Sequence, residues 1–262
     1  EPIKGNPETA TGRRLDASQQ AALQKTQMNR YYNQLDAVYS EMYRRAINTT
    51  SKSSPGGERA MEFLRRCKAD GCPIECLKDP EFVMDMFDAH TQLLIDMYDE
   101  LKKLGVEFDG AWFSDDLGYR NAPLISPQMY RELVFPFHKR LCDHVAKDGL
   151  KTMLHSDGNV EPLIPHFLEA GISCLHPLEA KAGLDVRQLK PKYGNKLVLF
   201  GNIDVRKLAK TKEDIEEEIS SKIPIAKEGG GYIYHSDHSV PDDISFSNYK
   251  FAIELVRKYG SY

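Results

Sequence analysis

The sequence contains no apolar stretch that approaches the roughly 20 residues of a membrane-spanning helix, so no membrane span is expected. It also lacks an excess of positive charge, because 35 Lys and Arg residues stand against 39 Asp and Glu residues. The resulting formal net charge of -4 gives no electrostatic reason to expect nucleic acid or an anionic membrane as a partner. No Gly-x-Gly-x-x-Gly follows a predicted strand, which argues against a dinucleotide-binding turn.

No stretch with the features of a signal peptide opens the sequence. The five cysteines are an odd number in a long chain, which favours reduced thiols and predicts a cytoplasmic protein. The spacing of Cys67, Cys72 and Cys76 matches no metal or cluster signature, so we interpret them as ordinary thiols. The first residue is Glu1 and not Met, which is compatible with a start inside a longer protein.

The 262 residues suffice for one large domain with a sizeable core. We expect residues 1–57 to form an N-terminal arm, a helix over 17–47 and a loop over 48–57. That loop has two interpretations, a surface loop and an active-site lid. Residues 58–262 are expected to form the catalytic region, a single β/α domain.

After residue 105 short apolar runs alternate regularly with helical patterns. The helix that opens at Ser126-Pro127, with a good N-cap and a good first residue, is expected to run to about residue 147. The other predicted elements are helices over 58–68, 80–104, 160–170, 184–193, 212–227 and 246–259, and strands over 106–113, 150–154, 172–175, 197–200 and 231–234. This alternation is typical of parallel βαβ units, in either a (β/α)8 barrel or a doubly wound sheet.

Each predicted strand ends in polar residues. The endings are Ser114-Asp115-Asp116, His155-Ser-Asp157, His176-Pro-Leu-Glu179, Gly201-Asn-Ile-Asp204 and His235-Ser-Asp-His238. Polar groups at the end of every strand, and not at one switch point, favour the (β/α)8 TIM barrel. Because only about five strands are visible, the first strands of the barrel are expected to be irregular or absent from this chain.

These strand endings, with Asp115-Asp116-Leu-Gly, Ser126-Pro-Gln-Met-Tyr-Arg and Gly229-Gly-Gly-Tyr-Ile, resemble the uroporphyrinogen decarboxylase superfamily over residues 60–262. More narrowly, the chain is similar to the corrinoid-linked methyltransferases of that superfamily, the methylcobamide:coenzyme M and O-demethylase methyltransferases. The resemblance implies a barrel with its site at the C-terminal mouth. It also implies transfer of a methyl group from a small methylated, for example methoxylated aromatic, compound to a corrinoid carried by a partner protein.

The resemblance further implies a zinc ion, which these relatives hold through a His-x-Cys pair and a late Cys. His155 matches that histidine, Asp157 stands at the first cysteine, and His238 stands at the late cysteine. A set of one Asp and two His is still suited to catalytic zinc, which takes three N or O ligands and one open position. It is harder than a thiolate set and less selective for zinc.

Further roles follow for residues at the other strand ends. We expect Asp115, Asp116 or Glu179 to protonate the leaving group, and strand alternation directs only one of the two aspartates into the pocket. Tyr119, Asn202 and His176 are expected to contact substrate. Trp112 is assigned to the core, and His138, on a predicted helix, to the surface.

Two rival functions stay open beside the methyltransferase. One is a metal-independent decarboxylase like uroporphyrinogen decarboxylase itself, which needs Arg or Lys clamps for an acidic substrate. The other is a degenerate member that binds without catalysis. The expected assembly is a monomer or homodimer.

Overall fold

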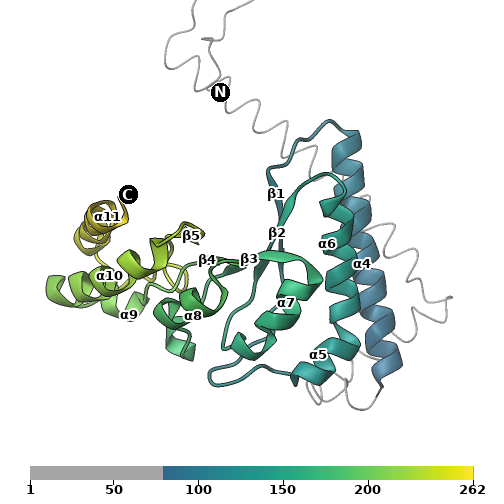
Figure 1. Cartoon of the computed structure of the whole chain (residues 1–262), viewed down its shortest axis with the longest axis horizontal. Coiled ribbons are helices and arrows are strands. Elements are labelled where there is room, and N and C mark those ends of the chain that lie inside the picture. Colours follow the sequence, from purple (N-terminus) through teal and green to yellow (C-terminus); the bar gives the residue numbers. More distant parts are fainter. Residues whose placement is uncertain (1–78, 262) are drawn as a thin grey trace, which may run out of the picture. The chain divides into compact units, whose positions relative to one another are not determined.

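The structure of the protein is a computed structural model that describes residues 79–261 (Figure 1). The chain divides into the units Glu1–Glu62 and Phe63–Tyr262, and all described residues belong to the second. The expected N-terminal arm, the helices over 17–47 and 58–68, the loop over 48–57 and the three cysteines Cys67, Cys72 and Cys76 therefore lie outside the described residues.

Five parallel strands form one sheet in the order β1-β2-β3-β4-β5. The strands are β1 (Gly110–Ser114), β2 (Lys151–His155), β3 (Ile172–His176), β4 (Val198–Phe200) and β5 (Tyr232–Ile233). Each strand pairs with the next one along the chain, and a helix lies between them. This sequential order is that of a (β/α)8 barrel and not of a doubly wound sheet, whose order reverses at a switch point.

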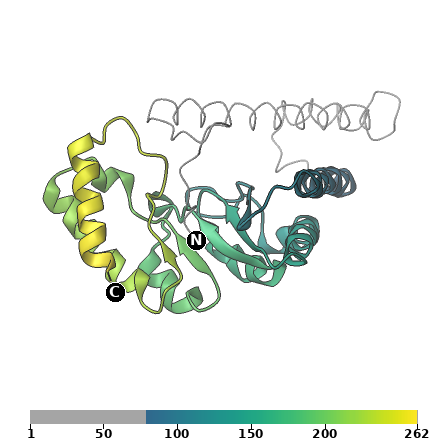
Figure 2. The same ribbon diagram turned by 90° about the horizontal axis from the view of Figure 1, so that it is seen from above.

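Helices pack against one face of this sheet (Figure 2). Leu154, Leu175 and Leu199 lie side by side on β2, β3 and β4 and are fully buried there. The helices are α4 (Pro80–Lys103), α5 (Pro127–Leu133), α6 (Phe135–Ala146), α7 (Ile164–Ala170), α8 (Val186–Tyr193), α9 (Val205–Leu208), α10 (Lys212–Lys227) and α11 (Phe246–Gly260). Burial of each such leucine contributes about 1.5–3 kcal/mol, so this layer holds the helices to the sheet.

The opposite face of the sheet carries Trp112, Met153 and Cys174, which lie next to one another on β1, β2 and β3. Trp112 is 54% exposed, and a hollow of about 340 Å³ is lined by these three residues and their neighbours. In a (β/α)8 barrel this face would be the interior, closed by eight strands. Within residues 79–261 there are five strands, which agrees with the number visible in the sequence.

The elements differ from the sequence expectation in several places, and three of the differences have a clear local cause. β1 begins at Gly110, four residues later than predicted. The helix expected from Ser126 to about residue 147 divides at Val134 into α5 and α6, just before Pro136, because proline cannot donate the hydrogen bond that a continuous helix needs. The short helix α9, capped by the Asp204 carboxylate, was not predicted.

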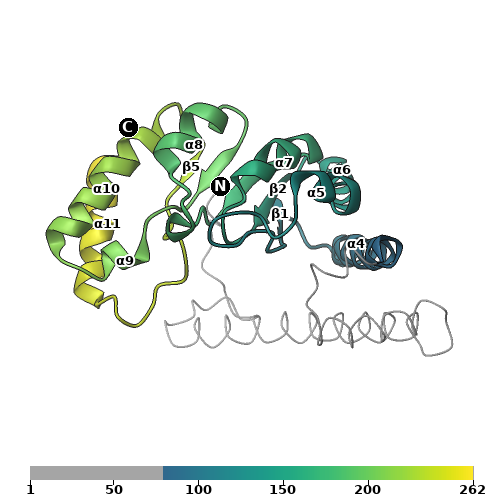
Figure 3. The same cartoon turned by 90° about the horizontal axis from the view of Figure 1, so that it is seen from below.

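The helices α10 and α11 pack against each other in the C-terminal part (Figure 3). α10 begins at the N-cap Thr211, whose hydroxyl accepts from Asp214 N, and it packs along α11 through a second apolar cluster that includes Ile215, Ile219 and Leu255. Among the helices that the structure describes, we find none with the length and apolar character required to span a bilayer.

Candidate active site

The carboxyl ends of the parallel strands lie at one edge of the sheet and bring the predicted site residues to it. Ser114, His155 and His176 are register partners on β1, β2 and β3, so their side chains emerge next to one another. The loop after β1 is joined to β2 because Asp115 N donates to His155 O, and Ser156 N in turn donates to His176 O. Backbone hydrogen bonds alone thus hold the ends of β1, β2 and β3 next to one another.

Asp116, His155 and Asp157 form a compact group at this edge. One potential ligand atom from each lies within 4.8 Å of the other two. His155 Nε2 is 3.9 Å from Asp116 Oδ1 and 3.8 Å from Asp157 Oδ2, and Asp157 N donates to Asp116 Oδ1. Asp157 Oδ1 is buried and, within the described part of the chain, has no hydrogen-bond partner. A buried carboxylate oxygen without a donor is costly, and a cation held by both oxygens of Asp157 would satisfy it.

Two glycines make the approach of Asp116 to Asp157 geometrically feasible. A Cβ atom on Gly118 would lie 2.4 Å from Asp157 O, and a Cβ atom on Gly158 would lie 2.3 Å from Gly118 C. Gly158 also has a φ of +81°, which L side chains rarely adopt. The loops after β1 and β2 therefore touch backbone to backbone, and no other residue type fits at the contact.

Three histidines form a row that begins at the same group. His155 Nδ1 is 2.8 Å from His176 Nδ1, His176 Nε2 is 3.4 Å from His235 Nδ1, and His235 Nδ1 is 2.6 Å from Ser236 O. Burial first, and then the neighbouring His235 and His155, lower the pKa of His176 from 6.5 to about 4. His176 is therefore neutral at pH 7.

Aromatic rings surround the middle of this row. Trp112 and Phe200 approach the His176 ring edge-on, with ring centroids 5.0 and 4.6 Å away. The assignment of Trp112 to the core is wrong, because its side chain lies on the open face of the sheet, opposite the helix-covered one. Its exposed ring is available to stack on a flat ligand.

Asp115 and Asp116 have different partners. Asp115 Oδ2 is 3.1 Å from Nε2 of His138, and Nδ1 of the same histidine is 2.9 Å from the hydroxyl of Tyr130. His138 and Tyr130 are both buried, so the expectation of a surface position for His138 is wrong. The reason is that α6 turns this face toward β1 and Asp115, and the carboxylate satisfies the imidazole there.

Glu179 and Asn202, two predicted site residues, hold backbone in place. Glu179 accepts from Gly158 N at 2.6 Å and pairs with Lys181 Nζ at 2.7 Å. Asn202, which is fully buried, accepts from Val186 N and donates to Leu178 O and Leu184 O. The side-chain amide of Asn202 is thereby fully used within the protein, so its predicted contact with substrate stays a prediction without geometric support.

Two predicted residues lie outside these clusters. Tyr119, in the loop after β1, is 66% exposed. His238 is also exposed, and among the described residues it does not join the group of Asp116, His155 and Asp157. Its role as a metal ligand stays a prediction, and the geometry offers Asp116 in its place.

Asp237 has a structural role that was not predicted from the sequence. It is completely buried, and its carboxylate accepts from Val205 N, Ala180 N and Lys181 N. These donors belong to the loops after β4 and β3, whereas Asp237 follows β5. An acidic residue between two histidines was visible in the sequence, but nothing in the pattern indicated that it points inward.

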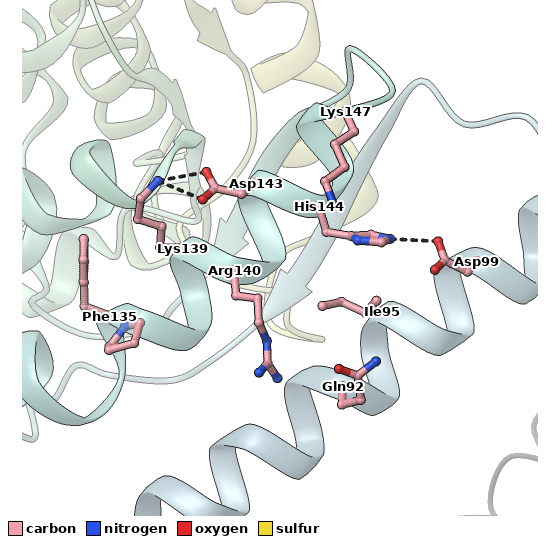
Figure 4. Close-up of a pocket in the computed structure, with 10 residues that line it drawn as sticks. Gln92, Ile95, Asp99, Phe135, Lys139, Arg140, Asp143, His144 and Lys147 are labelled. Atoms are coloured by element: carbon pink, nitrogen blue, oxygen red, sulfur yellow. Dashed lines mark hydrogen bonds and ion pairs between the residues drawn. The ribbon is translucent and has the colours of Figure 1, made fainter.

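A separate groove of about 780 Å³ lies between α4 and α6, away from the strand ends (Figure 4). Its charged side chains are mostly paired, as in Lys139 with Asp143 and His144 with Asp99, both 2.9 Å or less apart. Paired charges on an open helix surface are well solvated and do not by themselves define a binding site.

Comparison with known proteins identifies a sequence family for this chain and a solved structure of similar fold. Residues 68–259 match the family model described as Uroporphyrinogen decarboxylase (URO-D). A uroporphyrinogen decarboxylase from Pseudoalteromonas atlantica is 23% identical over 146 residues, which are 53% of this chain and 39% of that protein. Another, from Vesicomyosocius okutanii, is 29% identical over 77 residues, 29% of this chain and 22% of that protein.

Among solved structures, a methyltransferase from Methanosarcina mazei superimposes with a TM-score of 0.56 at 19% identity, covering 71% of this chain and 52% of that chain. The chain thus spans about half, or less, of the length of these proteins. The structural match supports the barrel-type fold, and the family model covers well over half of the sequence. The chain belongs to the uroporphyrinogen decarboxylase family.

Proposed function

We propose that the protein is a methyltransferase that moves a methyl group from a small methylated compound to a corrinoid carried by a partner protein. The observation that carries this proposal is the group of Asp116, His155 and Asp157 at the C-terminal edge of the sheet, with one unpartnered buried carboxylate oxygen. The name of the structural neighbour, a methyltransferase, supports the same reaction class.

The donor set fits a divalent metal ion. His155 Nε2 and one carboxylate oxygen each from Asp116 and Asp157 would hold it, which is the three-ligand arrangement of catalytic zinc. When bound, zinc would act as a Lewis acid on the leaving atom of the methyl donor. Two carboxylates and one imidazole form a hard set, so the site would also accept other divalent ions more readily than a thiolate site would.

Asp115 is the best placed general acid of this chain. Its carboxyl group follows directly on β1, next to Asp116, and is not part of the ligand group. His138 Nε2 lies 3.1 Å from Asp115 Oδ2 and would return a proton to it after each turnover. Glu179 is unsuited to this role, because both of its carboxylate oxygens are already occupied, Oε2 by Gly158 N and Oε1 by Lys181 Nζ.

The open aromatic face suggests the class of methyl donor. Trp112 and Phe200 flank His176, one strand away from His155, and the ring of Trp112 is largely exposed. A planar methoxylated aromatic ring would stack on Trp112 and direct its ether oxygen toward the strand ends. Tyr119, exposed in the loop after β1, would contact the same substrate or the docked partner.

A decarboxylase is the rival function, because the aligned relatives from Pseudoalteromonas and Vesicomyosocius bear the name uroporphyrinogen decarboxylase. An acidic tetrapyrrole requires arginine or lysine side chains that are available to clamp its carboxylates. After β3 and β4 the cations Lys181 and Arg206 are already paired with Glu179 and Asp204. These two cations are therefore not available to clamp the carboxylates of a substrate.

The proposal is tested by metal analysis and by methyl transfer. We expect about one zinc per chain after reconstitution, and loss of that zinc in Asp116→Asn and in His155→Ala. The control is His90→Ala, which removes an exposed histidine of α4 and leaves the zinc content unchanged. With a supplied corrinoid protein in the Co(I) state, a panel of methoxylated aromatics should then yield methylated corrinoid.

The outcomes separate the candidate functions. Zinc that remains in both site variants would contradict the metal assignment. Release of carbon dioxide from uroporphyrinogen without any metal would establish the decarboxylase instead. Zinc binding without transfer from any donor would support the third alternative, a family member that binds without catalysis.

A further inference from the structure

The three-histidine row has a hydrogen-bond direction that is fixed at one end. His235 Nδ1 lies 2.6 Å from the carbonyl oxygen of Ser236. A carbonyl oxygen only accepts, so this imidazole nitrogen must carry a proton. The tautomer of His235 is therefore determined by the backbone of its own neighbour.

The proton on His235 Nδ1 in turn determines the tautomer of His176. His176 Nε2, 3.4 Å from the same protonated nitrogen of His235, can only accept. A neutral imidazole carries one proton, so that of His176 must be on Nδ1. A doubly protonated His176 would set a second N–H against His235 Nδ1–H over 3.4 Å, so the geometry selects the neutral ring.

The last ring follows in the same way. His176 Nδ1 donates to His155 Nδ1 across 2.8 Å, so His155 accepts there and carries its own proton on Nε2. That nitrogen faces Asp116 Oδ1 at 3.9 Å and Asp157 Oδ2 at 3.8 Å. We propose that the Ser236 carbonyl, through His235 and His176, holds His155 in the tautomer whose N–H points into the group of Asp116 and Asp157.

A proton on His155 Nε2 disfavours the binding of a metal ion to the same nitrogen. A metal ligand needs the lone pair of Nε2, so binding would require the His155 proton to leave or to move to Nδ1. If it moved to Nδ1, the row would reverse, and His176 Nε2–H would face His235 Nδ1–H over 3.4 Å. Two donors in opposition repel, so metal binding would displace the loop after β5. This second part rests on the metal site proposed above, whereas the tautomer of His155 does not.

His176 and His235 are thus positioning residues. They do not bind the metal ion themselves, but they lower the affinity of the group of Asp116, His155 and Asp157 for it. The row links the strand ends of β2, β3 and β5, and Asp237, two residues after His235, ties the same loop to Ala180 and Val205. Occupancy of the group at Asp116 would therefore be coupled to the position of the loop after β5.

The test is a nitrogen-15 NMR spectrum of the histidine rings in the metal-free protein at pH 8. We expect His155 to show a protonated Nε2 and an unprotonated Nδ1. His235→Phe keeps the ring packing against Phe200 but removes the fixed donor, so His155 should become a mixture of both tautomers. His235→Asn places an amide donor near the position of Nδ1 and should preserve the wild-type spectrum.

Zinc affinity supplies the second measurement. Removal of the opposed donor in His235→Phe should tighten zinc binding roughly threefold to tenfold, the effect of about one hydrogen bond. His235→Asn should bind like the wild type, and His90→Phe serves as the surface control. A His155 ring protonated mainly on Nδ1 in the metal-free wild type, or a tautomer unchanged in His235→Phe, would overturn the inference. The spectrum decides this even if the protein binds no metal, so failure of the proposed function is distinguishable.

Discussion

At the scale of single residues, the candidate site depends on the backbone contact between Gly118 and Gly158. This contact brings a carboxylate from the loop after β1 beside the carboxylate and imidazole of the loop after β2. Because the two backbones already touch, the position of Asp116 relative to Asp157 is sensitive to a single methyl group.

We expect Gly158→Ala to reduce the free energy of unfolding by several kcal/mol and to weaken zinc binding. The left-handed backbone alone costs an alanine about 1–2 kcal/mol, and the clash of its Cβ with Gly118 adds to that cost. Gly149→Ala is a matched control, because Gly149 has a similar φ of +76° with no heavy atom within 4 Å of its virtual Cβ. Urea unfolding and zinc titration of both variants test this, and equal losses in the two would contradict it.

Cys174 gives a prediction for alkaline pH. Burial raises the pKa of this thiol from 9.0 to about 12. Above pH 9 the unfolded thiol loses its proton while the folded thiol keeps it, so the unfolded state binds fewer protons and stability falls as pH rises toward 12. The slope from this group is about 1.4 kcal/mol per pH unit.

Cys174→Ala should lack that slope. Its free energy of unfolding, lower than that of the wild type at about pH 8 because of the lost burial, should approach the wild-type value as pH rises to about 11. Tyrosines with raised pKa values contribute equally to both proteins and cancel in the difference. The prediction is refuted if the difference in free energy of unfolding between the wild type and Cys174→Ala is the same at about pH 8 and about pH 11.

The sequence could place His155 and Asp157 close together because both belong to one strand ending. Asp116 could not be placed beside them in this way, because its approach depends on the contact between two glycines 40 residues apart. His138 was misplaced for a related reason. A helical pattern shows which face is apolar, but not that a histidine on it meets a buried carboxylate.

At the scale of elements, the loops after β3, β4 and β5 are tied together by one buried carboxylate. Asp237 satisfies the backbone N–H groups of Ala180, Lys181 and Val205, so the start of α9 and the 3-10 turn over Ala180–Ala182 depend on it. The row of histidines and the bond from Gly158 N to Glu179 depend on the same loops.

We expect Asp237→Asn to reduce the free energy of unfolding by about 2–4 kcal/mol, because an amide nitrogen would replace one acceptor and leave buried donors unsatisfied. Asp242→Asn, an exposed position in the following loop, should change it by less than about 0.5 kcal/mol. Thermal and urea unfolding of both variants provide the measurement. A tolerance of Asp237→Asn equal to that of the control would show that these bonds do not hold the loops.

Most of the elements from residue 80 onward were predictable, because periodicity and caps are local. Ser126 as N-cap and the helix that starts at Pro80 appear where the pattern places them. The late start of β1 and the short helix α9 were not predictable. The first is decided by pairing of Gly110 with Lys151 on the next strand, and the second by burial of Asp204 and its partners.

At the scale of the whole molecule, the open face of the sheet gives a direct optical test. The chain has a single tryptophan, and Trp112 is 54% exposed on that face. We expect its fluorescence to be red-shifted and readily quenched by acrylamide, as for a solvated indole. A methoxylated aromatic that stacks on it should reduce this quenching, whereas cyclohexanol, which is not planar, should not. A blue-shifted emission that resists acrylamide would show that the face is covered.

The consecutive order of the strands has a consequence for how the chain folds. Each strand pairs with its neighbour in sequence, and the shortest interval between paired residues is the 20 residues from Thr152 on β2 to Ile172 on β3. The entropy lost in closing a loop grows with its length, so β2 and β3 are the pair that can form first. Strands on either side can then be added one at a time to an existing edge. Synthesis on the ribosome would release the strands in nearly the same order. The contact between His155 and His176 would then form together with the first strand pair, β2 and β3.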